Sequence, residues 1–372
     1  MLSTPTVNKT PQLRLSRSQT LFEAAIERIS AAYPKDLARK EGIHSWPDPL
    51  PSPTFQRPDP LLLFTPAEDG SRRPEAEPSQ PYQAIIPMTR NEMLEHRNRE
   101  RIKPSMQIPL GLVDKPEEQQ VDTFLVDLHG TTDARSGGPL LIAGPQHSGK
   151  ATALQTMLLW LTTCFLPERL RCAVIDPLGE LDQFRALPHF RHPSGETLWT
   201  DGNSDEDLTR FIRTISADIQ QRHDKFPNQR WERHTLAQLW SQGLTMPQFL
   251  LIISNYQSFA ERVSASTALQ KLIQTVVETR LQGHYLILTS TETSARYITP
   301  EVMGACGTKI GLALHERQRH ELFGHAAFST EAIPGRGLLM TTDRKIHQVQ
   351  LALSAPGHTE SSRDQYLRQE IA

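Results

Sequence analysis

The sequence has little cysteine, no long apolar run and almost no net charge. Its three cysteines, Cys164, Cys172 and Cys306, lack the spacing of a metal site, and we expect them to be buried, reduced thiols. No apolar stretch approaches the roughly 20 residues of a membrane span, and the start of the chain has no signal-peptide pattern. A formal charge of −2 without a run of like charges does not favour DNA or anionic lipid as a partner. These absences predict a cytoplasmic protein without direct membrane insertion, which reaches the inner face of a membrane only through partners.

Proline is distributed unevenly, because 17 of the 28 prolines lie in residues 1–116. Proline fixes φ and removes a backbone donor, so we expect a partly disordered, Pro-rich extension over residues 1–104, with one helix near residues 20–29. From residue 105 onward, strand and helix patterns alternate, as in α/β proteins with a largely parallel sheet and helices on both faces. The sequence therefore predicts an extension, an α/β domain over 105–354 and a C-terminal tail over 355–372.

The expected elements of this α/β domain follow from apolar periodicity. Strands are expected near residues 123–128, 140–143, 171–175, 249–253, 285–289 and 309–314. Helices are expected over 152–161, 205–225 and 266–281, and a closing hairpin over 337–342 and 346–353.

A phosphate-binding loop follows the strand expected at 140–143. Gly144, Gly149 and Lys150 fit the pattern G-x-x-x-x-G-K, and a helical pattern begins directly afterwards. The backbone N–H groups of such a loop bind phosphate together with the helix dipole, and the lysine adds a positive charge. The residues predicted to bind ATP are Gly144, Pro145, Gln146, His147, Ser148, Gly149, Lys150, Ala151 and Thr152. Of these, His147 is expected to act through its backbone N–H.

Two groups that ATP hydrolysis needs are missing. The residue after Lys150 should carry a hydroxyl that binds magnesium, but it is Ala151, and the nearby hydroxyl of Thr152 comes one residue late. The strand at 249–253 ends in Ser254 and Asn255, where acidic residues would hold the magnesium shell and orient water. We therefore expect weak or absent Mg²⁺ binding, and we assign no catalytic residue.

Three further residues are candidate nucleotide sensors, each with a plainer alternative. Asp176 follows a strand and either lies near the nucleotide or orients its own loop. Thr289 ends an inner strand and either senses the γ-phosphate or is an ordinary strand residue. Arg336 lies between two glycines and either reaches a phosphate of a neighbouring subunit or, as we favour, caps its turn.

In their order and spacing, several motifs resemble the FtsK/SpoIIIE-type P-loop ATPases, and among them the second or third ATPase module of EccC-type type VII secretion ATPases. These motifs are the lead-in Ile108–Gln119, the strand end Val174–Gly179, the turn Leu187–His189, the glycine-arginine turn Ile333–Gly337 and the linker-like Trp46–Leu50. The resemblance implies a RecA-like P-loop NTPase fold with ATP as its nucleotide.

Active members of this family carry Ser or Thr in place of Ala151, and acidic residues in place of Ser254 and Asn255. The resemblance therefore implies a degenerate module that binds ATP weakly or without efficient hydrolysis. Its implied partners are other ATPase modules or a membrane-anchored secretion ATPase chain, together with secreted protein substrates. Two alternatives stay open: an active ATP-driven translocase of DNA or protein, and a scaffold domain without nucleotide. The sequence leaves undecided whether the chain is an enzyme.

Overall fold

The computed structural model describes residues 106–118, 120–129, 138–226, 229–231, 239, 246–324, 330, 333–355 and 360–371. The helix, the Pro-rich segment and the module linker expected in the N-terminal extension lie outside these residues. The chain divides into a small unit, residues 1–47 and 116–120, and a large unit, residues 48–115 and 121–372. The described residues of the small unit are the 3-10 turn η1 (Pro116–Glu118) and the first residue of strand β2.

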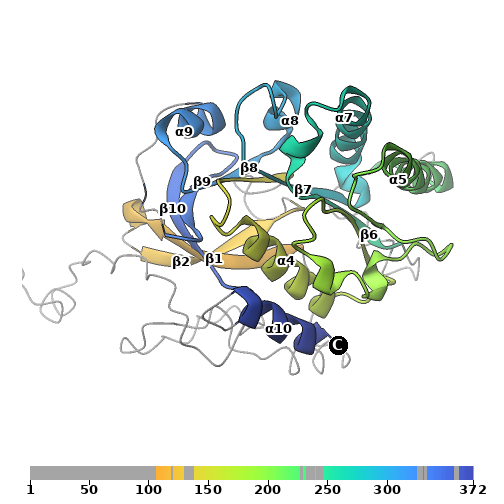
Figure 1. Ribbon diagram of the computed structural model, residues 1–372, viewed down its shortest axis with the longest axis horizontal. Coiled ribbons are helices and arrows are strands. Elements are labelled where there is room, and N and C mark those ends of the chain that lie inside the picture. The colour runs from red at the N-terminus through yellow and green to blue at the C-terminus, as the bar shows by residue number, and fades with distance from the viewer. Residues whose placement is uncertain are drawn as a thin grey trace, which may run out of the picture. The chain divides into compact units, whose positions relative to one another are not determined.

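A ten-stranded sheet is the frame of the large unit (Figure 1). Its order is β2-β1-β10-β9-β8-β3-β7-β6-β4-β5, and the strands from β8 to β5 are parallel to one another. On the other side of β8, the neighbouring pairs β8–β9, β9–β10 and β10–β1 are antiparallel. The bounds are β1 Gln107–Lys115, β2 Gln120–Asp127, β3 Leu140–Ala143, β4 Leu170–Ile175, β5 Trp199–Thr200, β6 Gln248–Ile253, β7 His284–Ser290, β8 Thr308–Leu312, β9 Arg336–Met340 and β10 Ile346–Leu351.

Helices cover both faces of this sheet, as Figure 1 shows. On one face lie α4 (Lys150–Cys164) and α10 (Glu360–Ile371), whose apolar side chains join one buried cluster with β1 and β2. On the other face, α5 (Asp205–Lys225), α7 (Val263–Glu278), α8 (Pro300–Ala305) and α9 (Glu316–Phe323) share a second cluster. Short 3-10 turns complete the order: η2 Asp182–Phe184, η3 Pro188–Phe190, η4 Tyr256–Phe259 and η5 Arg280–Gln282. The predicted α/β class, a largely parallel sheet with helices on both faces, is confirmed.

Each expected strand of the α/β region is present, with ends shifted by three residues at most. The sequence analysis did not identify β1, β5, α8, α9 and α10. Strand β5 has only two residues, too few for a periodic pattern to appear. Helix α10 lies within the expected C-terminal tail, and its Leu367 is buried in the same cluster as α4.

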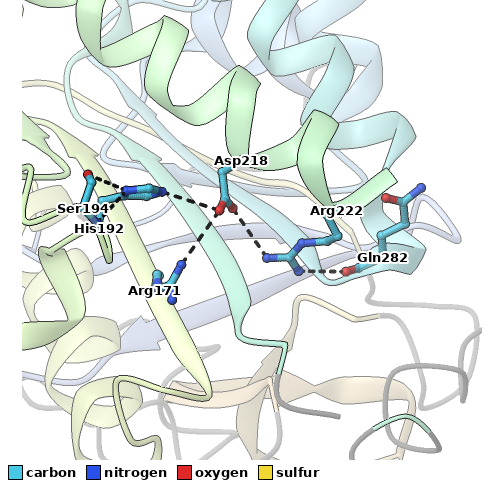
Figure 2. A network of polar contacts seen from close by, with 6 residues as sticks. All are labelled: Arg171, His192, Ser194, Asp218, Arg222 and Gln282. Atoms are coloured by element: carbon cyan, nitrogen blue, oxygen red, sulfur yellow. Dashed lines mark hydrogen bonds and ion pairs between the residues drawn. The ribbon is translucent and has the colours of Figure 1, made fainter. Parts of the chain in front are cut away.

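An ionic network fastens α5 to the sheet (Figure 2). The Asp218 carboxylate on α5 lies 3.8 Å from Arg171 of β4, 3.8 Å from His192 and 3.6 Å from Arg222 on the next helical turn. Arg222 also donates a 3.1 Å hydrogen bond to the carbonyl of Gln282. Burial lowers the pKa of Arg222 to about 10, and the Asp218 carboxylate opposes this shift. Arg171 stands at the amino end of β4, whereas the phosphate-binding loop follows the carboxyl end of the parallel strand β3, so we assign this network a structural role.

Candidate functional site

The predicted phosphate-binding loop lies between β3 and α4, at the carboxyl edge of the parallel strands. Strand β3 is flanked by β7 on one side and β8 on the other. The backbone N–H of Gly144 donates a 3.0 Å hydrogen bond to the carbonyl of Ser290, at the end of β7. Gly149 caps the start of α4 with φ at 107°, a conformation that favours glycine. Strand, loop and helix therefore follow one another as the sequence predicts.

The loop requires glycine at two positions and contains an unsatisfied polar group that a phosphate would use. A Cβ at Gly144 would lie 2.6 Å from the Leu312 carbonyl oxygen, and one at Gly149 would lie 3.0 Å from the amide nitrogen of Gly335. The Ser148 hydroxyl is buried and has no hydrogen-bond partner among the described residues. A helix N-terminus beside an unpartnered hydroxyl fits a bound anion. The residues present therefore fit the triphosphate of a nucleotide.

Lys150 turns back onto the loop that precedes it. Its ammonium donates hydrogen bonds to the carbonyl oxygens of Gly144, at 2.8 Å, and Pro145, at 2.7 Å. The residue is only 6% exposed, and burial lowers its pKa while the charge of Glu180 opposes that shift. Phosphate oxygens are charged acceptors and form stronger bonds with an ammonium than backbone carbonyls do. A nucleotide would therefore compete well for Lys150.

Ser254 and Asn255 follow β6, two strands away from the phosphate-binding loop in the sheet. Both residues are buried, and Asn255 adopts a left-handed conformation with φ at 50°. The backbone N–H of Asn255 donates a 3.0 Å hydrogen bond to the hydroxyl of Thr289. Thr289 belongs to β7, which lies between β3 and β6, so the predicted sensor residue joins the two halves of the candidate site. A role for Thr289 in sensing phosphate stays a prediction.

Glu180 also belongs to this site, and the sequence analysis missed it. Its Oε2 atom accepts hydrogen bonds from the Ser254 hydroxyl at 3.2 Å and from the Asn255 side-chain amide at 3.0 Å. A carboxylate therefore lies at the end of β6, where the strand itself provides none. The sequence signal that points to Glu180 is its position directly after the motif Val174–Gly179. Parallel pairing of β4 with β6 brings the ends of the two strands together.

Asp176 and Arg336 are both buried. Oδ2 of Asp176 accepts a 2.8 Å hydrogen bond from the backbone N–H of Leu181, so this carboxylate orients its own loop. Asp176 also lines a surface pocket of about 680 Å³ beside β5 and the start of α5. Nε of Arg336 donates a 3.1 Å hydrogen bond to the side-chain oxygen of Gln350, which links β9 to β10. Contact of either residue with nucleotide stays a prediction.

Asp176 should make stability depend on pH. Burial raises its pKa from 3.8 to about 6, so the folded state binds more protons than the unfolded state between these values, and stability falls as pH rises through them. Asp176→Asn keeps an acceptor for Leu181 and removes the charge. At 1.36 kcal/mol per pKa unit, we expect it to be about 3 kcal/mol more stable than wild type at pH 8 and close to wild type at pH 4.

Urea unfolding at pH 4 and pH 8 measures this difference. The control is Asp182→Asn, which removes an exposed acid from the same loop and should give only a small pH-dependent gain, because its charge is the smallest of the causes that raise the pKa of Asp176. An Asp176→Asn variant with the same stability difference at both pH values would contradict the assignment.

The remaining expectations concern thiols, metals and membranes. All three cysteines are buried and free, as predicted. In the described part of the chain, no group of three or more His, Cys, Asp or Glu side chains could hold a metal ion. No helix among the described residues is both long and apolar enough to cross a bilayer.

Comparison with known proteins gives the site a family context. The sequence profile of the FtsK/SpoIIIE family matches residues 92–357. The ESX secretion system protein EccC of Geobacillus thermodenitrificans is 25% identical over 246 residues, which cover 65% of this chain and 15% of that protein. The ESX-4 secretion system protein EccC4 of Mycobacterium tuberculosis is 24% identical over 249 residues, covering 65% of this chain and 19% of its own. The chain thus spans less than a fifth of the length of either relative.

Two solved structures share the fold. EssC (ATPases 2 and 3) from Geobacillus thermodenitrificans matches with a TM-score of 0.60 and 23% identity over 72% of this chain and 48% of that one. Thermomonospora curvata EccC (ATPases 2 and 3), in complex with a signal sequence peptide, matches with a TM-score of 0.58 and 22% identity over 72% and 46%. These similarities agree with the predicted RecA-like P-loop fold and with the predicted likeness to the second and third ATPase modules.

Proposed function

Since the chain belongs to the FtsK/SpoIIIE family, we propose that it is an ATP-binding module of a type VII-like protein secretion machine and that it hydrolyses ATP slowly or not at all. The observation that carries this proposal is the combination of an intact phosphate-binding loop with neutral residues at the end of β6. Gly144, Gly149 and Lys150 keep the shape and charge of a phosphate site. Ser254 and Asn255 are buried where a water-activating acid would stand.

Binding of ATP draws support from the loop. The Ser148 hydroxyl has no partner among the described residues, and the ammonium of Lys150 is held at the loop by two carbonyl groups. A triphosphate would supply acceptors to both groups.

Slow turnover draws support from the missing groups. Ala151 offers no hydroxyl to a metal, and neither Ser254 nor Asn255 can accept a proton at neutral pH. Loss of a metal ligand and loss of the group that orients water each cost orders of magnitude in rate. We expect turnover below about 0.001 s⁻¹, against 1 s⁻¹ or more for typical enzymes.

The proposed partners follow from the relatives. EccC and EccC4 are named as secretion system proteins, and the Thermomonospora curvata structure holds a signal sequence peptide. For this chain we propose binding to neighbouring ATPase modules, or to a membrane-anchored secretion ATPase, and recognition of secreted proteins. Direct DNA translocation is not favoured, because the net charge is −2.

Restoring the missing groups tests the proposal. The triple variant Ala151→Ser, Ser254→Asp, Asn255→Glu should raise ATP turnover at least about tenfold, since it returns a metal hydroxyl and two acids to the site. The matched control is Ala151→Ser, Ser254→Asn, Asn255→Gln, which has side chains of the same size without carboxylates. Both variants place a long side chain at the left-handed position 255, so the backbone strain cancels in the comparison.

Steady-state ADP release, measured on preparations with matched melting profiles, gives the result. Equal turnover in the two triple variants would show that more of the machinery is missing than these three positions. Fast turnover in the wild-type chain would favour the active-translocase alternative instead.

A further inference from the structure

We infer that Glu180, in the loop after the neighbouring strand β4, takes over the role that Ser254 and Asn255 cannot fill: its carboxylate would accept hydrogen bonds from the water shell of a nucleotide-bound Mg²⁺. The inference rests on the proposed ATP site and adds a residue to it. Of the two expected outcomes, weak or absent magnesium binding, it favours weak binding, because one carboxylate remains at the site.

The position of the Glu180 carboxylate is the first observation that supports this role. Its Oε2 atom lies 3.2 Å from the Ser254 hydroxyl and 3.0 Å from the Asn255 amide nitrogen, so it sits directly over the end of β6. Oε1 accepts no hydrogen bond from the part of the chain that the structure describes. Two neutral donors therefore orient the acid through one oxygen and leave the other oxygen for a ligand.

The backbone around Glu180 is fixed from two sides. The carbonyl oxygen of Glu180 accepts a 3.1 Å hydrogen bond from the side-chain amide of Gln155 on α4, the helix that begins with Lys150. The next residue, Leu181, donates its backbone N–H to Asp176 at 2.8 Å. Gln155 is itself held by the Ser354 hydroxyl, which donates to its side-chain oxygen at 3.0 Å. Glu180 is thus positioned by the same helix whose start forms the phosphate site.

The charges of Glu180, Lys150 and a bound triphosphate give the second argument for this role. The Glu180 carboxylate lies close enough to Lys150 to raise the pKa of the lysine against the effect of burial. A triphosphate bound at Lys150 would bring several negative charges toward this carboxylate. Like charges at short range in a partly buried site repel strongly unless a cation lies between them. The single ammonium of Lys150 does not neutralise both the triphosphate and the Glu180 carboxylate, so a divalent cation between them would relieve the repulsion.

The ligand set also fits magnesium. Mg²⁺ bound to nucleotides keeps several waters and typically takes one or two protein carboxylates together with phosphate oxygens. Among the described residues no group of three or more His, Cys, Asp or Glu side chains could hold a metal ion, and none is needed for this mode of binding. Because Ala151 provides no hydroxyl, Glu180 would be the main protein contribution, and we expect the magnesium effect to be modest.

Nucleotide affinity with and without metal tests the inference. Calorimetric titration with ATPγS is performed in MgCl₂ and in EDTA, for wild type, Glu180→Gln and the control Asp182→Asn. Glutamine retains the size of the side chain, and Asp182→Asn removes an exposed acid two residues away. We expect wild type and Asp182→Asn to bind about tenfold more tightly with magnesium, and Glu180→Gln to lose this preference while binding in EDTA at least as tightly as wild type.

A rescue variant separates a metal role from a purely structural one. The double variant Glu180→Gln/Asn255→Asp exchanges the amide and the carboxylate of this hydrogen-bonded pair. The carboxylate is then at position 255, at the end of β6, and the magnesium preference should reappear. A magnesium preference that persists in Glu180→Gln would overturn the inference, as would a wild-type chain that binds ATPγS equally well in EDTA. If wild type binds no ATPγS in EDTA or in magnesium, the proposed function itself fails, and the inference fails with it.

Discussion

Replacing Lys150 by alanine should weaken ATPγS binding at least about 100-fold, the largest effect on binding that we expect from a single substitution. A charged hydrogen bond between an ammonium and phosphate in a partly buried site is worth about 3 kcal/mol. Isothermal titration with ATPγS measures the change. Folding should be affected little, since the ammonium of Lys150 contacts only two backbone carbonyls.

Lys271→Ala is the matched control. Lys271 is exposed on α7, on the opposite face of the sheet from α4, and its removal should leave ATPγS affinity unchanged. Thermal melting of both variants checks that they are folded. If Lys150→Ala binds ATPγS as tightly as the control, the nucleotide does not use the predicted loop.

Gly337→Ala should lower the free energy of unfolding by about 3 kcal/mol, a large stability effect for one added methyl group. Gly337 belongs to β9, and a Cβ there would lie 2.2 Å from the carbonyl oxygen of Gly311 on β8. No side chain can move to relieve this contact, because the opposing atom belongs to the backbone of a paired strand. The strands must separate locally, at the cost of ladder hydrogen bonds.

Gly304→Ala adds the same methyl group where the structure has space. Gly304 lies in α8, is exposed, and has no atom within 4 Å of the position of a Cβ. Alanine favours helices over glycine by up to about 1 kcal/mol, so this variant should be as stable as wild type or slightly more stable. Urea unfolding compares the two substitutions. Equal stabilities would mean that β8 and β9 are not paired at this register.

The parts of the fold that could be predicted are those whose pattern lies within one continuous segment. The run Leu140–Ala143, the glycine loop after it and the amphipathic segment Asp205–Lys225 each carry their own signal, and each element is present. Strand β5 is too short to show a period. Helix α10 is polar along most of its length. It packs on the core through the buried Leu367 and the partly buried Tyr366 and Ile371, too few apolar residues for a clear pattern, so its sequence resembles a tail.

The same distinction applies to the site. The residues Gly144 to Thr152 form one contiguous motif, and the structure places them in the loop after β3 and the first turn of α4. Glu180 belongs to the site through a contact with Ser254 and Asn255, which lie more than seventy residues away in the chain. Only the pairing of β4 with β6 brings them together, and no spacing rule along the sequence expresses that pairing. The sequence analysis therefore recognised that Ser254 and Asn255 replace acids at the end of β6, but it did not identify Glu180, the acid that lies beside them.

A single-turnover experiment tests the central claim most directly. Radiolabelled ATP at trace concentration is mixed with excess wild-type chain and MgCl₂, and bound nucleotide is collected on filters and separated into ATP and ADP over time. With turnover below about 0.001 s⁻¹, the protein should retain nucleotide that is still mostly ATP after about 10 minutes. Conversion to ADP within seconds, or the absence of retained nucleotide at protein concentrations up to about 100 μM, would contradict the account of an ATP-binding module with slow hydrolysis.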